Sequence, residues 1–176
     1  FLENRKNQSG IVYCLSQKLT EQCSEFLRSE GFNAYPFHAG LDTQVKIDTQ
    51  DKFMTEDNVV VCATIAFGMG IDKADVRYIA HISLPSSMEA FYQEIGRAGR
   101  DGLEADTLLI FGLQDLFQRK RFIDMSDAHD SFKIKEHKRL DALIAYCDSA
   151  TCRRQTLLSY FKDCLLYTSP SPRDKT

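Results

Sequence analysis

The run Val59–Ala63 constrains the fold most, because it is wholly apolar and rich in β-branched residues. Such a run is typical of a strand that is buried on both faces, as in a parallel sheet covered by helices. Further strands are predicted where apolar runs alternate with helical patterns, at Ile11–Leu15, Asn33–His38, Tyr78–Leu84 and Thr107–Phe111. This alternation predicts an α/β fold built in layers, with right-handed crossovers between parallel strands.

Helical spacing fills the intervals between the predicted strands. Apolar residues recur at helical spacing between Leu19 and Leu27, and Asp42 is placed to cap a helix that runs to about Met54. After Gly112 the periodicity is wholly helical, and helices are predicted at Lys135–Asp148 and Thr151–Phe161. A short all-helical segment therefore follows the α/β layer.

A helix is predicted to begin at Ser86, which stands at capping-box spacing from Glu89. On this helix Gln93, Arg97 and Arg100 lie at i, i+4 and i+7, on one face. Guanidinium groups give bidentate hydrogen bonds to phosphate, so two of them on one face can clamp a phosphate chain. The alternative is a solvated charged face, which spacing alone favours.

Two glycines, Gly96 and Gly99, interrupt the same segment. A glycine inside a helix costs about 1 kcal/mol relative to alanine. The pair therefore predicts either a close approach of two backbones or an early end of the helix.

The segment also resembles a helicase motif. Its pattern Gln-x-x-Gly-Arg-x-Gly-Arg-Asp-Gly, after the pair Phe91-Tyr92, resembles the sixth motif of superfamily 2 helicases in the form seen in the RecQ family of DNA helicases. Val59–Lys73 resembles the fifth motif, Gly10–Ser16 the fourth, and Phe37–Leu41 the family's His-Ala-Gly-Leu turn. The motifs arrive in family order, and the resemblance covers roughly Gly10 to Phe161. It implies that the α/β layer is the second RecA-like lobe of a helicase core.

The resemblance implies roles for several residues around a nucleotide bound between two lobes. Arg100 is expected to be the arginine finger on the γ-phosphate, with Arg97 as its support. Gln93 is expected to link the helix to the nucleotide or to the opposite lobe. Asp72, with Gly70 just before it, resembles the acid that contacts the ribose hydroxyl; capping of a loop is the alternative role for Asp72.

DNA contacts are expected where apolar strands end. Thr64 and Ser16 each stand at such a point, where hydroxyl and backbone N–H groups can bind phosphate without reading bases. Ser16 has an equally strong alternative as a helix cap. His38 is expected to pack in its loop or form hydrogen bonds there. The partner is therefore expected to be single-stranded and partly duplex DNA, recognised by structure rather than by sequence.

The sequence lacks the Gly-x-x-x-x-Gly-Lys-Ser/Thr loop and the Asp-Glu-x-His run that belong to a first helicase lobe. The chain begins with Phe1 rather than Met. We therefore expect a fragment whose partner is the missing first lobe of the same polypeptide. ATP and Mg²⁺ are the expected cofactors, with their main ligands in that lobe, so the fragment alone is expected to be inactive.

The cysteine pattern gives only part of a zinc site. None of the six cysteines forms a Cys-x-x-Cys pair. By resemblance, Cys152 is the first of four ligands in the RecQ zinc-binding subdomain, but no cysteine follows Cys164. Zn²⁺ is thus expected in a full-length protein and not in this chain. The net charge of −3 gives no general basic surface, so DNA contacts must be local.

The predicted organisation has three parts: a helicase lobe over residues 1–112, the helical start of a truncated zinc-binding subdomain over 113–163, and a Ser/Pro-rich, non-native tail over 164–176. The predicted function is the C-terminal motor lobe of a 3′–5′ ATP-dependent DNA helicase of RecQ type, acting in repair and recombination. The alternatives are a non-catalytic nucleic-acid-binding module and an RNA helicase lobe. No membrane span is expected, and the location would be the bacterial nucleoid in the cytoplasm, or the nucleus in a eukaryote.

Overall fold

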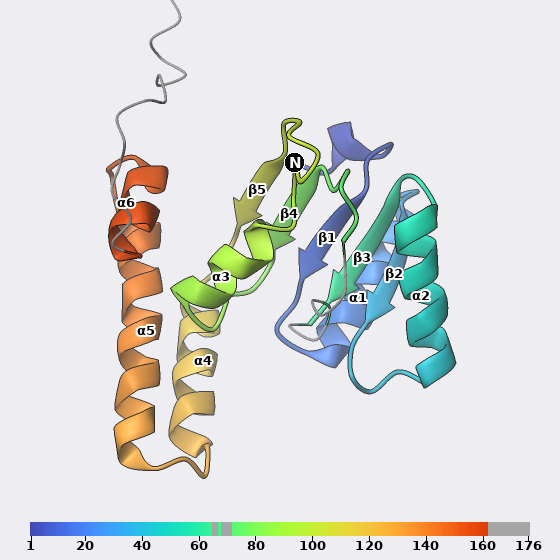
Figure 1. Cartoon of the computed structure of the whole chain (residues 1–176). Helices are drawn as coiled ribbons and strands as arrows, with labels where there is room; N and C mark the ends of the chain where they lie inside the picture. Colours follow the sequence, from blue (N-terminus) through green and yellow to red (C-terminus); the bar gives the residue numbers. More distant parts are fainter. Residues whose placement is uncertain (65–66, 68–71, 162–176) are drawn as a thin grey trace, which may run out of the picture. The chain divides into compact units, whose positions relative to one another are not determined.

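The computed structural model of the chain describes residues 1–64, 67 and 72–161 (Figure 1). Their contacts form two compact units that divide between Asp127 and Ala128. The first unit contains the sheet and the second is helical.

The first unit is built on a five-stranded parallel sheet in the order β2-β3-β1-β4-β5 (Figure 1). In the middle of the sheet, Ile11 pairs with Val61 on one side and with Ile79 on the other. The strands are β1 (Gly10–Tyr13), β2 (Asn33–Phe37), β3 (Val59–Ala63), β4 (Tyr78–His81) and β5 (Asp106–Leu109). The predicted parallel α/β layer is confirmed.

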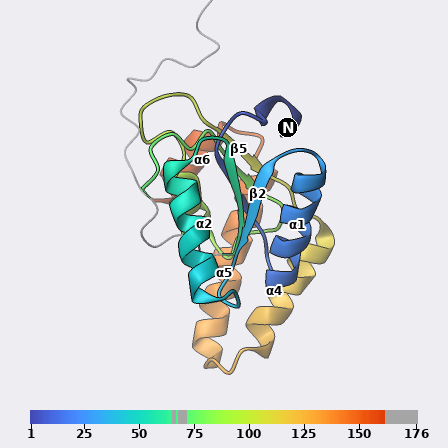
Figure 2. The same ribbon diagram turned by 90° about the vertical axis from the view of Figure 1, so that its right-hand side faces the viewer.

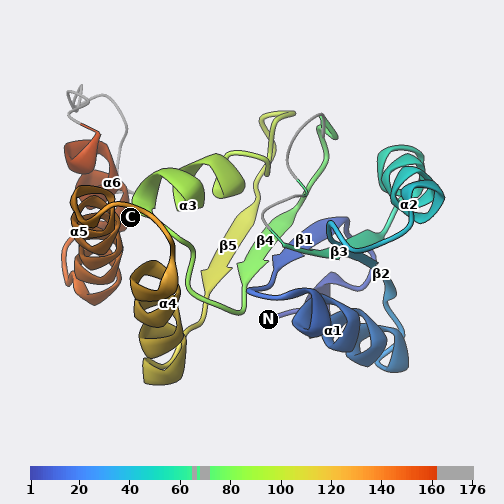
Figure 3. The same cartoon turned by 90° about the horizontal axis from the view of Figure 1, so that it is seen from below.

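Helices cover both faces of the sheet. Figure 3 shows α1 (Gln17–Ser29) on one face, with α2 (Thr43–Thr55) and α3 (Met88–Ile95) on the other. Seen from the side of β2, α1 and α2 lie on opposite sides of the strand (Figure 2). The remaining helices of this unit are the short 3₁₀ helix η1 (Glu3–Arg5) and α4 (Leu113–Met125). In the second unit, α5 (Asp130–Asp148) and α6 (Arg153–Tyr160) contact each other.

The central strand β3 explains why its sequence is apolar throughout. All five of its residues are fully buried, because alternate side chains enter two different cores. Val61 belongs to the core that contains Phe53 of α2, whereas Cys62 belongs to the core that contains Leu27 of α1. A period-2 strand with helices on both faces has no solvated side on which polar residues are favoured.

The predicted helix ends need correction at α3. Its N-cap is Ser87 and not Ser86: the Ser87 hydroxyl accepts a hydrogen bond from the Ala90 N–H at 3.2 Å. The helix ends at Ile95, so the predicted helical face that joined Gln93, Arg97 and Arg100 is wrong. The early end that the glycines offered as one alternative is confirmed. Asp42 caps α2 as predicted.

Among the described residues, no helix has both the length and the apolar character needed to span a membrane.

Candidate nucleotide and nucleic-acid sites

The chain leaves α3 in a turn that carries both arginines. Gly96 is the C-cap, and the Gly99 N–H donates to the Val76 carbonyl at 3.0 Å, which pins the turn beside the start of β4. Gly99 has φ +64°, and a Cβ atom there would lie 2.8 Å from the Leu103 carbonyl oxygen. This turn therefore requires glycine for its conformation and for its close backbone contact.

Within this turn, Arg100 meets the acid predicted from the fifth motif. Arg100 Nη1 lies 2.5 Å from Asp72 Oδ1, and Arg100 Nε donates to the Gly96 carbonyl at 3.4 Å. The Asp72 side chain is 84% exposed, so the ion pair stands at the surface. The structure thus brings together two predicted site residues that are 28 positions apart in the chain.

Asp101, the residue that follows Arg100, anchors the turn. Its N–H donates to the Ala74 carbonyl at 3.2 Å, and its carboxylate accepts from the Leu103 N–H at 3.1 Å and pairs with Arg77. Burial acts to raise the pKa of Asp101. The hydrogen bonds from Leu103 and Arg77, together with the Arg77 charge, outweigh this effect, so the pKa of Asp101 lies below its usual value. These contacts hold the backbone of the turn while leaving the Arg100 guanidinium at the surface.

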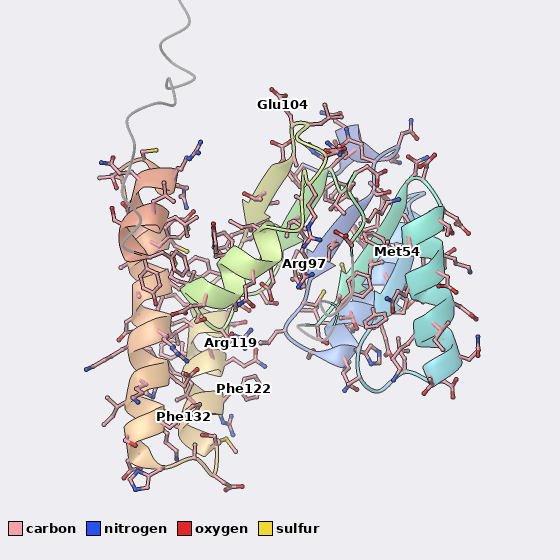
Figure 4. All side chains as sticks on the ribbon, viewed as in Figure 1. Met54, Arg97, Glu104, Arg119, Phe122 and Phe132 are labelled. Atoms are coloured by element: carbon pink, nitrogen blue, oxygen red, sulfur yellow. The ribbon has the colours of Figure 1, made fainter. Side chains whose placement is uncertain are left out.

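Arg97 points the other way, toward the end of β1 (Figure 4). Its charge acts on the hydroxyl of Tyr13, the last residue of β1. Burial and the charge of Glu94 raise the pKa of Tyr13 well above its usual value, and the charge of Arg97 opposes that rise. Arg97 is therefore half-buried and does not belong to a solvated face.

Sequence reasoning missed a buried polar group that contacts Tyr13. His81 is 1% exposed; its Nε2 lies 2.7 Å from Glu94 Oε2, and its ring stacks on Tyr13 with centroids 5.0 Å apart. A charged residue beside Gln93 and a histidine at the end of an apolar strand were the available signals. Buried polar groups of this kind need partners: His81 Nε2 has Glu94 and the Tyr13 hydroxyl has the Phe67 carbonyl, whereas His81 Nδ1 has no hydrogen-bond partner among the described residues.

The remaining predicted nucleotide residues are Gln93 and Gly70. Gln93 is an exposed residue on α3, just before the helix ends. Gly70 falls outside the described residues.

The predicted DNA residues lie at the carboxyl edge of the sheet. The Thr64 N–H donates to the Phe37 carbonyl at 3.2 Å, which extends the ladder between β2 and β3 by one residue. The Ser16 hydroxyl caps α1 by accepting from the Leu19 N–H at 3.2 Å. His38 is 3% exposed and contacts Glu21 of α1 at 3.2 Å, so its predicted packing role is confirmed.

One basic residue of α4 is drawn into the lobe. Arg119 is half-buried, and its Nε donates to the Leu84 carbonyl at 2.8 Å (Figure 4). Burial lowers the pKa of Arg119, while the charges of Glu94 and Asp115 oppose the shift. Arg119 thus attaches α4 to the segment that precedes α3.

Comparison with protein families agrees with this geometry. Residues 1–102 match the helicase conserved C-terminal domain. The chain belongs to this family. Residues 113–165 match the RecQ zinc-binding domain.

Two relatives of this chain have names of RecQ-type DNA helicases. It is 44% identical over 162 residues to the RecQ-like DNA helicase BLM of Xenopus laevis, covering 90% of this chain and 12% of that protein. It is 42% identical over 161 residues to the ATP-dependent DNA helicase RecQ of Haemophilus influenzae, covering 92% of this chain and 26% of that protein. The chain thus spans between an eighth and about a quarter of the length of these relatives.

Solved structures support the fold alone. The second domain of the Mss116p DEAD-box helicase, bound to an RNA duplex, aligns with a TM-score of 0.57 at 14% identity, covering 91% of this chain and 69% of that chain. A DEAD box protein from Methanococcus jannaschii aligns with a TM-score of 0.55 at 24% identity, covering 71% of this chain and 35% of that chain. Both are consistent with a RecA-like second lobe.

The zinc ligands that the second family implies are incomplete in the described residues. Cys152 is exposed and is the N-cap residue of α6, and Cys164 lies outside the described part. Within residues 1–64, 67 and 72–161, no group of three or more His, Cys, Asp or Glu side chains is placed to hold a metal. Structural zinc takes four ligands, so the described residues do not fit a zinc ion.

Proposed function

We propose that this chain is the second motor lobe of a 3′–5′ ATP-dependent DNA helicase of RecQ type, acting in repair and recombination. The observation that carries the proposal is the ion pair of Arg100 with Asp72, which joins the sixth-motif arginine to the fifth-motif acid in a fixed turn at the surface. The names of the relatives, an ATP-dependent DNA helicase and a RecQ-like DNA helicase, support the reaction class.

In this proposal Arg100 acts on charge that develops during phosphoryl transfer. It leaves Asp72 for the γ-phosphate when the two lobes close, and its planar guanidinium then stabilises the transition state. Asp72, released from the pair, accepts a hydrogen bond from the ribose hydroxyl near Gly70. Exchanging one anionic partner for another keeps the guanidinium charge compensated in both states.

Arg97 and Gln93 have supporting roles. Arg97 is half-buried and supports the turn from its inner side. Gln93, exposed on α3, faces the nucleotide or the first lobe in the closed enzyme. The first lobe of the same polypeptide is the proposed partner, and it supplies the main ligands of ATP and Mg²⁺.

Thr64 and Ser16 are the proposed DNA contacts. Both stand at the carboxyl edge of the sheet, where Thr64 continues the ladder and Ser16 begins α1. Backbone N–H groups and hydroxyls there bind phosphates of single-stranded or partly duplex DNA. The working location follows from this substrate: the bacterial nucleoid, or the nucleus in a eukaryote.

The proposed domain limits remain 1–112 for the lobe and 113–163 for the start of the zinc-binding subdomain, with 164–176 as a non-native tail. Zn²⁺ is proposed for the longer protein, with Cys152 as one ligand, and not for this chain.

The test of the function uses a chimera in which residues 1–161 replace the matching segment of the Haemophilus influenzae relative. Phosphate release is measured with and without single-stranded DNA. We expect DNA-stimulated ATP hydrolysis and unwinding from the chimera, and none from the 176-residue chain alone. A folded chimera that binds DNA without hydrolysing ATP would favour a non-catalytic binding module, and stimulation by RNA but not DNA would favour an RNA helicase lobe.

A further inference from the structure

Two cysteine thiols meet where α1 packs on the sheet. Cys62 of β3 donates a hydrogen bond from its Sγ to the Sγ of Cys23 on α1, and the two sulfur atoms lie 3.5 Å apart. The residues are 39 positions apart in the chain, so the contact is tertiary. Both cysteines are free thiols in the structure.

Helical spacing brings Cys23 to this position. Leu19, Cys23 and Leu27 recur every four residues on α1, so all three face the core that lies on this side of the sheet (Figure 3). The same core contains Cys62, whereas the residues before and after it along β3 enter the other core. Both thiols are therefore held in place by regular secondary structure.

The two thiols differ in exposure and in acidity. Cys23 is half-buried, whereas Cys62 has no exposed surface. Hydrogen bonds from the Cys14 and Cys62 thiols lower the pKa of Cys23, although burial opposes this shift. The hydrogen bond to Cys23, together with burial, raises the pKa of Cys62. Because oxidation requires both a thiolate and access for the reagent, Cys23 is the thiol that reacts first and Cys62 the one that follows.

We propose that Cys23 and Cys62 form a dithiol that hydroperoxides oxidise to a disulfide across the contact of α1 with β3. With hydrogen peroxide, the Cys23 thiolate attacks one oxygen, the O–O bond breaks, and the hydroxide that leaves takes up the Cys23 proton as water. The Cys62 sulfur then attacks the Cys23 sulfenic acid. The S–S bond forms, the S–O bond breaks, and the hydroxyl leaves with the Cys62 proton as a second water. Two thiols thus lose two electrons and one peroxide gains them.

The disulfide would tie together two elements that lead to the carboxyl edge of the sheet. It joins α1, which begins after Ser16, to β3, which leads into Thr64. A cross-link between residues 39 positions apart removes loop-closure entropy from the unfolded chain, so oxidation should stabilise the lobe. The bond can form whether or not the lobe belongs to a motor, so it does not depend on the proposed function.

Oxidation of the whole chain tests the proposal. In a background with Cys147→Ser, Cys152→Ser and Cys164→Ser, the cysteines that remain are Cys14, Cys23 and Cys62. Trypsin places these three in separate peptides, residues 7–18, 19–28 and 53–73. The dilute chain is treated with hydrogen peroxide, its free thiols are titrated and then alkylated, and it is digested without reductant. Mass spectrometry identifies the linked peptides.

We expect a cross-link between residues 19–28 and 53–73 and a fall from three free thiols to one per chain. The unfolding temperature should rise by about 5 °C, and dithiothreitol should reverse all three changes. Cys62→Ala should abolish the cross-link and the rise. Cys14→Ala is the matched control and should keep both, because Cys14 is buried in the same core but its Sγ donates to the Val12 carbonyl at 3.8 Å.

Three results would overturn the proposal: a cross-link that includes residues 7–18, a link found only in dimers, or no loss of thiols from the folded chain. Should Cys62→Ala fail to fold, Cys23→Ser replaces it, since Cys23 is only half-buried. That variant should keep both remaining thiols after oxidation, and a rise in its unfolding temperature would contradict the assignment. Circular dichroism before oxidation checks the fold of each variant.

Discussion

The carboxyl edge of the sheet and the arginine turn present their functional groups in different ways. At the edge, Thr64 is placed by a backbone bond that continues the parallel ladder, and Ser16 by the cap of α1. In the turn, Arg100 is placed by an ion pair with Asp72 and by a glycine at positive φ. The edge is therefore fixed by regular secondary structure, whereas the turn depends on a few contacts, which the proposed function has a nucleotide exchange.

This contrast fits two different tasks. DNA phosphates repeat along a strand, so a rigid edge with hydroxyl and N–H groups suits them in any register. A transferred phosphoryl group needs charge at one position and only during the reaction. An arginine that rests on an acid and moves to phosphate meets that need, and variants that affect one region and spare the other test the division.

The largest effect is expected from Arg100→Ala. Removing a finger guanidinium should lower the ATPase rate of the chimera by about 10³-fold or more, because transition-state charge is left unbalanced. Single-stranded DNA affinity should stay within a few-fold of the parent, since the carboxyl edge is untouched. Phosphate release and fluorescence anisotropy measure the two quantities.

Arg100→Lys is the matched control for charge. It keeps the cation but cannot reproduce the planar fork, so it should rescue little of the lost rate. Equal losses of ATPase and DNA affinity in Arg100→Ala would show that the two regions are not separate.

The next effect concerns the backbone of the turn. Gly99→Ala should lower the free energy of unfolding of the chain by about 3 kcal/mol, because alanine at positive φ is strained and its Cβ would meet the Leu103 carbonyl. Gly102→Ala is the control: its φ is +79°, but a Cβ there meets nothing within 4 Å. We expect it to cost only the strain, about 1 kcal/mol. Urea denaturation measures both, and equal losses would show that contact with Leu103 does not fix the turn.

The same contrast explains what the sequence could predict. The apolar run Val59–Ala63 is compatible with one structure, a strand buried on both faces. The ends of the predicted strands then pointed to Thr64 and Ser16 as candidate DNA contacts. The arginine turn had two solutions, because helical spacing and two glycines pointed to different structures. Tertiary bonds decided between them: Gly99 to Val76 and Asp101 to Ala74. Periodicity contains no information about such contacts, and for the same reason it could not pair Glu94 with His81.

A smaller effect is expected at the rigid edge. Thr64→Ala should weaken single-stranded DNA binding about tenfold, because a hydrogen bond to a charged phosphate is lost. ATPase should fall through lost stimulation, and saturating DNA should restore most of it, which separates this variant from Arg100→Ala. Titration of ATPase rate against DNA concentration makes the comparison. A loss of ATPase that saturating DNA does not restore would place Thr64 with the catalytic turn.

The smallest effect separates the two roles of Ser16. Ser16→Ala removes the cap of α1 and should cost about 1 kcal/mol of stability. Asp42→Ala removes the corresponding cap of α2, where Asp42 Oδ1 accepts from the Gln44 N–H at 2.8 Å, and should cost a similar amount. If Ser16 also contacts phosphate, its variant should bind single-stranded DNA a few-fold more weakly than the Asp42 variant at the same salt concentration. Equal affinities would leave Ser16 as a helix cap alone and reduce the proposed DNA edge to Thr64.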